Sequence, residues 1–161
     1  MKYIAAIAMM LITPAFAEEA TKSETVTIAE DYIAAYSTFD VSVMEPFFAD
    51  DMIFFDPTSS SQNADGGPFR FEGKDAVMKG LGDVAGQYAS FSLNYSVERH
   101  YESQGVVVFV AMLTYEGETK NGQTFEGGAP IVTAITVKDG KVVRHIDYFD
   151  YKGNAVDSDN E

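Results

Sequence analysis

Hydrophobic residues follow a helical pattern in the first part of the chain and a strand-like pattern in the second. From Thr25 to Asp40 they return every three or four positions, which predicts a first helix. These residues are Ile28, Tyr32, Ala35, Tyr36 and Phe39. Ser42-Val43-Met44-Glu45 has the form of a capping box and predicts a short second helix through Phe48. A third helix is predicted from Gly73 to Tyr88.

Alternating or continuous hydrophobic runs predict the strands. The first is Met52–Asp56, and a polar loop from Pro57 to Arg70 follows it. The others are Phe91–Tyr101, Val106–Glu116, Phe125–Val137 and Val142–Tyr151. Val106–Glu116 is nearly all hydrophobic, so we expect both of its faces to be covered. Helices followed by a meander predict an α+β fold: a strongly bent antiparallel sheet and about three N-terminal helices that enclose a pocket in a cone.

The last predicted strand, VVRHIDYFDY (142–151), places ionisable groups where a strand usually places core residues. Because side chains alternate along a strand, His145, Asp147, Phe149 and Tyr151 share one face. If that face is packed core, the His and the Asp must pair or shift their pKa values. If it lines a cavity, Asp147 is the candidate acid or base and His145 is placed to orient it or relay a proton.

The N-terminus has the pattern of a secretory signal peptide over residues 1–17. Lys2 precedes an apolar run from Tyr3 to Ile12, and a small-x-small site predicts cleavage after Ala17. The run is too short for a membrane span; a retained N-terminal anchor is the alternative. The remaining chain divides into a polar tail (18–24), one domain (25–152) and an acidic tail (153–161), and we expect a periplasmic or secreted protein.

Composition narrows the range of partners and cofactors. The net charge of −14 opposes binding to nucleic-acid phosphates and to anionic membranes. The absence of cysteine excludes a disulfide framework, thiol catalysis and thiolate metal sites. No ligand spacing predicts a metal site and no glycine-rich loop predicts a bound phosphate, so we expect no cofactor.

Three segments together resemble the nuclear-transport-factor-2-like superfamily. They are AEDYIAAYSTFDVSVMEPFFADDMIFFDP (29–57), FEGKDAVMKGL (71–81) and TVKDGKVVRHIDYFDY (136–151). The similar branches are the SnoaL-like polyketide cyclases, the limonene epoxide hydrolases and the ketosteroid isomerases, and the resemblance extends from about Thr25 to Tyr151. It implies the cone fold, which hosts isomerases, cyclases, hydrolases and plain binding domains.

The isomerase branch implies two site residues. Its first helix supplies a Tyr that donates a hydrogen bond to the carbonyl oxygen of the substrate, and Tyr32 matches it. Its general base is an Asp before a Pro, and Asp56 matches it. For this chain, core packing and an ordinary turn are the alternative interpretations of these two residues. The second oxygen donor of the isomerases, an Asp two residues after a Pro, is replaced by Val132, which argues against ketosteroid isomerisation.

The hydrolase and cyclase branches imply Asp147. They use an Asp in a last-strand motif Arg-Asp-Tyr-Phe-Asp, which HIDYFD matches with Ile146 in place of the Arg. In that geometry His145 faces the same cavity. The epoxide hydrolases also need an Arg and an Asp two apart on the strand before the Asn-Gly hairpin, and VVVFVAMLTYE contains neither.

We therefore expect an exported domain that binds a small, mostly apolar molecule and acts on it by cofactor-independent acid/base chemistry of the cyclase or isomerase kind. The candidate site residues are Asp147, Asp56, Tyr32 and His145. The alternative is a non-catalytic ligand-binding or association domain that forms a homodimer through the open sheet face along Val106–Leu113. An enclosed cavity lined by Asp147, Tyr32 and Asp56, with a mouth near the 57–70 loop, favours an enzyme. A pocket plugged by Phe54, Phe69 or Phe149 favours an association domain.

Overall fold

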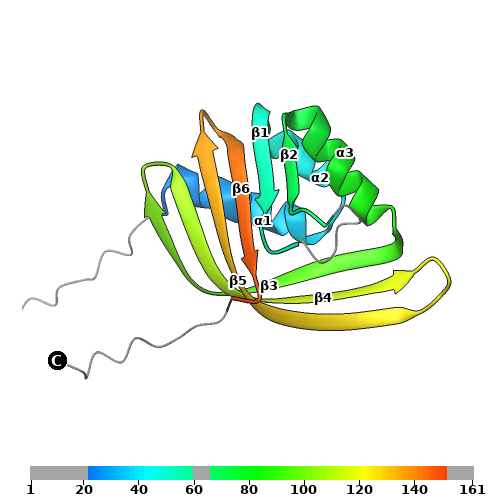
Figure 1. Cartoon of the computed structure of the whole chain (residues 1–161). Coiled ribbons are helices and arrows are strands. Elements are labelled where there is room, and N and C mark those ends of the chain that lie inside the picture. The colour runs from blue at the N-terminus through cyan, green and yellow to red at the C-terminus, as the bar shows by residue number, and fades with distance from the viewer. Residues whose placement is uncertain (1–21, 60–65, 152–161) are drawn as a thin grey trace, which may run out of the picture.

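The computed structural model describes residues 22–59 and 66–151. The predicted signal peptide (1–17), the acidic tail (153–161) and part of the 57–70 loop lie outside the described residues. Within the described ranges the chain forms α-helices, one 3₁₀ helix and a single six-stranded sheet (Figure 1). No helix in these ranges is long and apolar enough to cross a membrane.

The elements follow the predicted order, with one extra strand. The helices are α1 (Glu24–Ser37), α2 (Val41–Met44), η1 (Glu45–Phe47, 3₁₀) and α3 (Lys74–Ala85). The strands are β1 (Phe48–Asp56), β2 (Phe69–Glu72), β3 (Tyr88–Ser103), β4 (Val106–Thr119), β5 (Thr124–Lys138) and β6 (Lys141–Phe149). β2 is the extra strand, and part of it falls in the expected 57–70 loop. Four residues are too few to show a periodic hydrophobic pattern.

Short polar side chains cap the first two helices. The Ser23 hydroxyl accepts a hydrogen bond from the Val26 N–H at the start of α1. At the start of α2 the Asp40 carboxylate accepts from the Ser42 N–H, so the predicted capping box that begins at Ser42 is wrong. Asp40 has the extended backbone that an N-cap requires, whereas Ser42 is already inside the helix. Pro46 falls in η1, directly after α2.

The sheet has the strand order β2-β1-β6-β5-β4-β3. The predicted bent sheet and α+β class are confirmed, and β3 to β6 form the predicted antiparallel meander. One pair differs: β1 lies parallel to β6. β1 comes from the helical half of the chain and joins the edge of the meander without a hairpin, so nothing in its connection imposes the antiparallel direction.

The sheet bends so that its inner face receives the helices (Figure 1). α1 contacts β3, β4, β5 and β6, while α3 packs on β1, β2 and β3. On β4 the inward residues Val107, Phe109, Ala111 and Leu113 are buried, and Met112 on the other face is 41% exposed. The expectation that both faces of this strand are covered is therefore wrong for the described chain, because no described element packs on the outer face.

Candidate functional site

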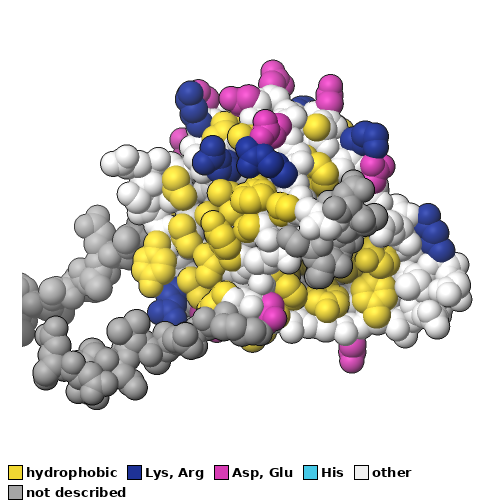
Figure 2. All heavy atoms as spheres, in the orientation of Figure 1, with side chains coloured by type: hydrophobic (Ala, Val, Ile, Leu, Met, Phe, Trp, Pro, Cys, Tyr) yellow, Lys and Arg dark blue, Asp and Glu magenta, His cyan; other side chains and the backbone are white. Residues whose placement is uncertain are grey.

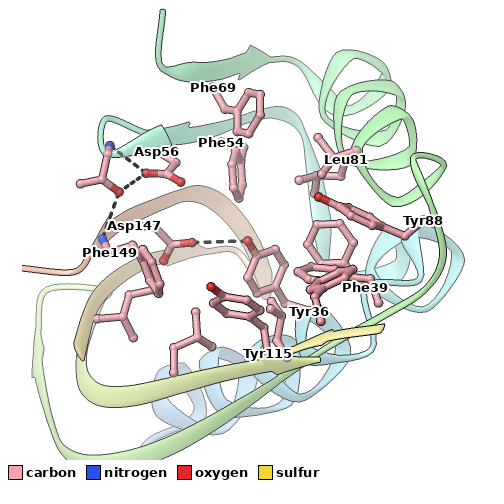
Figure 3. A pocket seen from close by; sticks show the side chains of 17 residues that line it. Tyr36, Phe39, Phe54, Asp56, Phe69, Leu81, Tyr88, Tyr115, Asp147 and Phe149 are labelled. Atoms are coloured by element: carbon pink, nitrogen blue, oxygen red, sulfur yellow. Dashed lines mark hydrogen bonds between the residues drawn. The ribbon is translucent and has the colours of Figure 1, made fainter. Parts of the chain in front are cut away.

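A pocket of about 500 Å³ opens between the inner face of the sheet, α1 and α3 (Figure 3). Its described lining is mainly aromatic, with aliphatic side chains between the rings. The lining residues are Tyr36, Phe39, Phe54, Asp56, Thr58, Phe69, Leu81, Val84, Tyr88, Phe91, Leu93, Leu113, Tyr115, Phe125, Ile131, Asp147 and Phe149. Phe54, Phe69 and Phe149 line this space without filling it, so the pocket can hold a small molecule.

Asp147 projects from β6 into the pocket wall and is only 4% exposed. Thr133 stands directly opposite on β5, and its hydroxyl donates to Oδ1 of Asp147 at 2.5 Å. The Tyr36 hydroxyl donates to Oδ2 at 3.4 Å. Each carboxylate oxygen of Asp147 therefore has a protein donor inside a largely apolar site.

His145 and Tyr32 lie behind Asp147, fully buried and outside the pocket lining. The Tyr32 hydroxyl lies 2.8 Å from Nδ1 of His145, and Nε2 of His145 lies 2.9 Å from Oδ2 of Asp147. The distance between Nε2 of His145 and Oδ2 of Asp147 is that of an ion pair, but the two groups are not aligned as a hydrogen bond. Tyr32, His145 and Asp147 therefore form a buried series that leads from the core to the pocket.

The tyrosine at the core end of this series keeps its proton. Burial, and then the nearby charge of Asp147, raise the pKa of Tyr32 well above 10. In the tautomer that carries its proton on Nε2, the ring nitrogen that faces Asp147, the N–H lies on the carboxylate side of the imidazole. Nδ1 is then left to accept the hydrogen bond that Tyr32 donates.

Asp56 lies at the end of β1, at the same end of the pocket as Asp147 (Figure 3). The backbone N–H and the hydroxyl of Thr58 both donate to its Oδ1, and the Thr58 hydroxyl accepts from the Phe149 N–H at 3.1 Å. Burial raises the pKa of Asp56, and the charge of Asp147 adds to this, although the Thr58 hydrogen bonds oppose it. Thr58 thus joins the ends of β1 and β6 at the pocket wall.

The structure brings the four residues named from the sequence into one cluster but gives them different positions. Asp147 and Asp56 line the pocket, whereas Tyr32 and His145 stand behind it. Tyr36 is the tyrosine of α1 that reaches the pocket, one helical turn after Tyr32.

Thr133 is a second contributor that the sequence pattern does not reveal. Val132, which the resemblance placed at an oxygen-donor position, pairs with Tyr148 and lies on the opposite face of β5 from Thr133. The inward position is taken by Thr133, and its hydroxyl is bound to Asp147. In the sequence, only the step of two residues from Ile131 to Thr133 indicates this inward direction.

The comparisons with known proteins identify the family. The family model of the SnoaL-like domain matches residues 29–145. The chain belongs to the SnoaL-like domain family. No curated protein matches the chain in a sequence search.

Solved structures share the fold of this SnoaL-like domain at low sequence identity. A SnoaL-like polyketide cyclase from Shewanella putrefaciens is 20% identical, with a TM-score of 0.68 over 91% of this chain and 94% of that one. TerC co-crystallized with polyporic acid is 21% identical, with a TM-score of 0.60 over 80% and 92%. A protein with a ketosteroid isomerase-like fold from Catenulispora acidiphila, in complex with trimethylamine, is 15% identical, with a TM-score of 0.58 over 76% of this chain and 84% of that one.

The chemistry available in this SnoaL-like domain is proton transfer. Asp147 offers a carboxylate at the pocket surface, and Tyr36 offers a hydroxyl beside it. Among residues 22–59 and 66–151 no group of three His, Asp or Glu side chains is arranged to hold a metal ion. The Asp147 carboxylate and the Tyr36 hydroxyl are groups suited to general acid/base catalysis.

Proposed function

We propose that this SnoaL-like domain binds a small, mostly apolar molecule and catalyses cofactor-independent acid/base chemistry on it, of the cyclase or isomerase kind. The observation that carries the proposal is the Asp147 carboxylate, which is nearly buried, held by protein donors and still part of the wall of an aromatic pocket. Buried carboxylates that reach the wall of such a pocket are frequent catalytic groups.

In this proposal Asp147 takes a proton from a carbon next to a carbonyl group. The electron pair of the broken C–H bond forms an enolate, which either attacks a second carbonyl carbon in a ring closure or receives the proton back at another carbon in a double-bond shift. Asp147 holds the proton between the two steps and then returns it, to the new alkoxide oxygen in the ring closure or to the other carbon in the double-bond shift. Once Asp147 has taken the proton, its carboxyl no longer needs the 3.4 Å hydrogen bond from Tyr36, and the Tyr36 hydroxyl at the pocket wall then donates to the enolate oxygen instead.

The residues behind the pocket act through Asp147 in this scheme. His145 orients the Asp147 carboxylate and Tyr32 fixes the imidazole tautomer, so both are positioning residues. Asp56 is a second carboxylate of the same pocket. Two of the structural neighbours were crystallised with small organic molecules, polyporic acid and trimethylamine, which supports the use of this fold as a small-molecule site.

A deuterium-exchange experiment tests the proposal without knowledge of the substrate. The protein is incubated with a small-molecule extract of its source cells in D₂O, and mass spectrometry detects compounds that gain deuterium. We expect at least one compound that is labelled by the wild type and by Asp51→Asn, a variant on the exposed side of β1, but not by Asp147→Asn. Equal labelling by the wild type and Asp147→Asn contradicts the assignment of Asp147.

A homodimer is the second proposal, and the outer face of the sheet favours it. Tyr101, Met112 and Tyr148 are exposed by 58%, 41% and 45%, and Figure 2 shows hydrophobic side chains gathered over the strands. Exposed apolar patches of this kind mark association surfaces. This dimer is compatible with a catalytic pocket on the inner face, and also with the alternative of a non-catalytic association domain.

Export is a further proposal, and it rests on the sequence alone. The apolar run and the cleavage site of residues 1–17 support secretion into the periplasm or the medium. N-terminal sequencing of the protein from its source cells tests this. A mature chain that begins at Glu18 is expected, and a chain that retains Met1 or Lys2 contradicts it.

A further inference from the structure

The pocket of the proposed function contains negative charge without a positive side chain in its described lining. Asp56 and Asp147 are its two charged residues, and they lie at the same end (Figure 3). His145 stands behind Asp147 and carries at most one positive charge. When both carboxylates are ionised, these three groups are therefore net negative in either protonation state of His145.

The two carboxylates differ in how well the protein satisfies them. Both oxygens of Asp147 accept hydrogen bonds, from Thr133 and Tyr36. In Asp56 the donors from Thr58 both reach Oδ1, and no described group donates to Oδ2. Of the two carboxylates, Asp56 is therefore the one with an acceptor oxygen that no described group occupies.

The pocket wall around these carboxylates is rich in aromatic side chains, which attract cations. Nine of the 17 described lining residues are Phe or Tyr, whose ring faces carry partial negative charge. Burial raises the pKa of Asp56 although the Thr58 hydrogen bonds oppose it, so its ionised form is only partly compensated there. A bound cation supplies that compensation, whereas an anion adds a third negative charge.

We propose that the natural ligand of this pocket is an organic ammonium cation on an apolar body, with its positive nitrogen beside Asp56 and between the aromatic rings. This inference rests on the proposed function and names its ligand class. The apolar body occupies the aliphatic and aromatic remainder of the pocket, which leaves Asp147 free to act as the acid or base.

The test compares three probes of similar shape and different charge by titration calorimetry with the full chain. They are benzyltrimethylammonium, its neutral carbon isostere neopentylbenzene, and the anion phenylacetate. We expect the ammonium to bind at least about tenfold more tightly than the neutral isostere and phenylacetate to bind most weakly. Asp56→Asn should remove the preference for the ammonium. Asp51→Asn, which changes the net charge equally but lies exposed on the same strand, should preserve it.

Three results overturn the inference, and they differ in whether they also contradict the proposed small-molecule function. If the neutral isostere binds as tightly as the ammonium, the ligand is not a cation although the small-molecule pocket remains. If Asp51→Asn weakens ammonium binding as much as Asp56→Asn does, the preference comes from the overall charge of −14 and not from the pocket. If none of the three probes binds the wild type, the proposed small-molecule function is contradicted as well.

Discussion

Replacing Tyr32 by Phe removes one buried hydroxyl and leaves the ring in place. Tyr32 is fully buried, and its hydroxyl lies 2.8 Å from Nδ1 of His145, which is also fully buried. The substitution therefore leaves a buried nitrogen without its partner. Such a loss costs about 1–3 kcal/mol of the free energy of unfolding, because water cannot replace the missing group.

Tyr95→Phe is the matched control for this change. The Tyr95 hydroxyl is also buried and lies near Thr133, but no described group meets it with hydrogen-bond geometry. Its removal takes away a buried polar atom that lacks an aligned partner, so we expect a change within about 0.5 kcal/mol or a slight stabilisation. The two substitutions are chemically identical, and the difference between them measures the Tyr32–His145 hydrogen bond.

Urea unfolding of the two variants provides the free energies, and equal m-values show that the unfolded states are comparable. A second assay is ¹⁵N NMR of the imidazoles, which is simple because the chain has only two histidines. We expect a protonated Nε2 in His145 of the wild type and a mixture of tautomers in Tyr32→Phe. The reasoning is refuted if Tyr95→Phe costs as much as Tyr32→Phe, or if the His145 tautomer is unchanged by Tyr32→Phe.

Four further substitutions have definite expected outcomes. The folded-state pKa of Asp56 is raised, so its ionised form lowers the free energy of unfolding once the pH exceeds the ordinary pKa of an Asp. Asp56→Asn should therefore raise the melting temperature at pH 7 by about 1–3 °C, and this gain should be lost below about pH 4. In α3, a Cβ added at Gly80 would lie 2.5 Å from the Phe71 ring, whereas one added at Gly82 would meet nothing closer than 3.8 Å. Urea unfolding should therefore show that Gly80→Ala is destabilised by about 1–3 kcal/mol and that Gly82→Ala is stabilised by up to about 1 kcal/mol. Met112→Glu on the outer sheet face should convert the proposed dimer into a monomer in sedimentation velocity, and a wild type that is monomeric at high concentration refutes the dimer.

The elements that the sequence predicts well are those with strong local signals. Asp139-Gly140, between β5 and β6, is a residue pair typical of a two-residue hairpin turn, and both residues adopt the positive φ that such a turn requires. The alternation along β6 correctly places His145 and Asp147 on the buried face. In both cases the relevant interactions lie within a few residues along the chain.

The details that the sequence does not reveal depend on how separate elements meet. Tyr32 and Tyr36 share one face of α1, and only the angle of α1 against the sheet decides which of them reaches the pocket. Thr133 contacts Asp147 because of the β5–β6 register, and a shift of one residue would turn Thr133 outward. The parallel pairing of β1 with β6 also has no local signal.

Native mass spectrometry of the protein purified from its source cells tests the central claim most directly, that Asp147 belongs to a small-molecule site. We predict that the wild type and Asp51→Asn carry the same bound small molecule and that Asp147→Asn carries less of it, since Asp147 lies in the pocket wall and Asp51 is exposed on β1. A wild type without any bound molecule, or an Asp147→Asn variant that retains it fully, would contradict the claim.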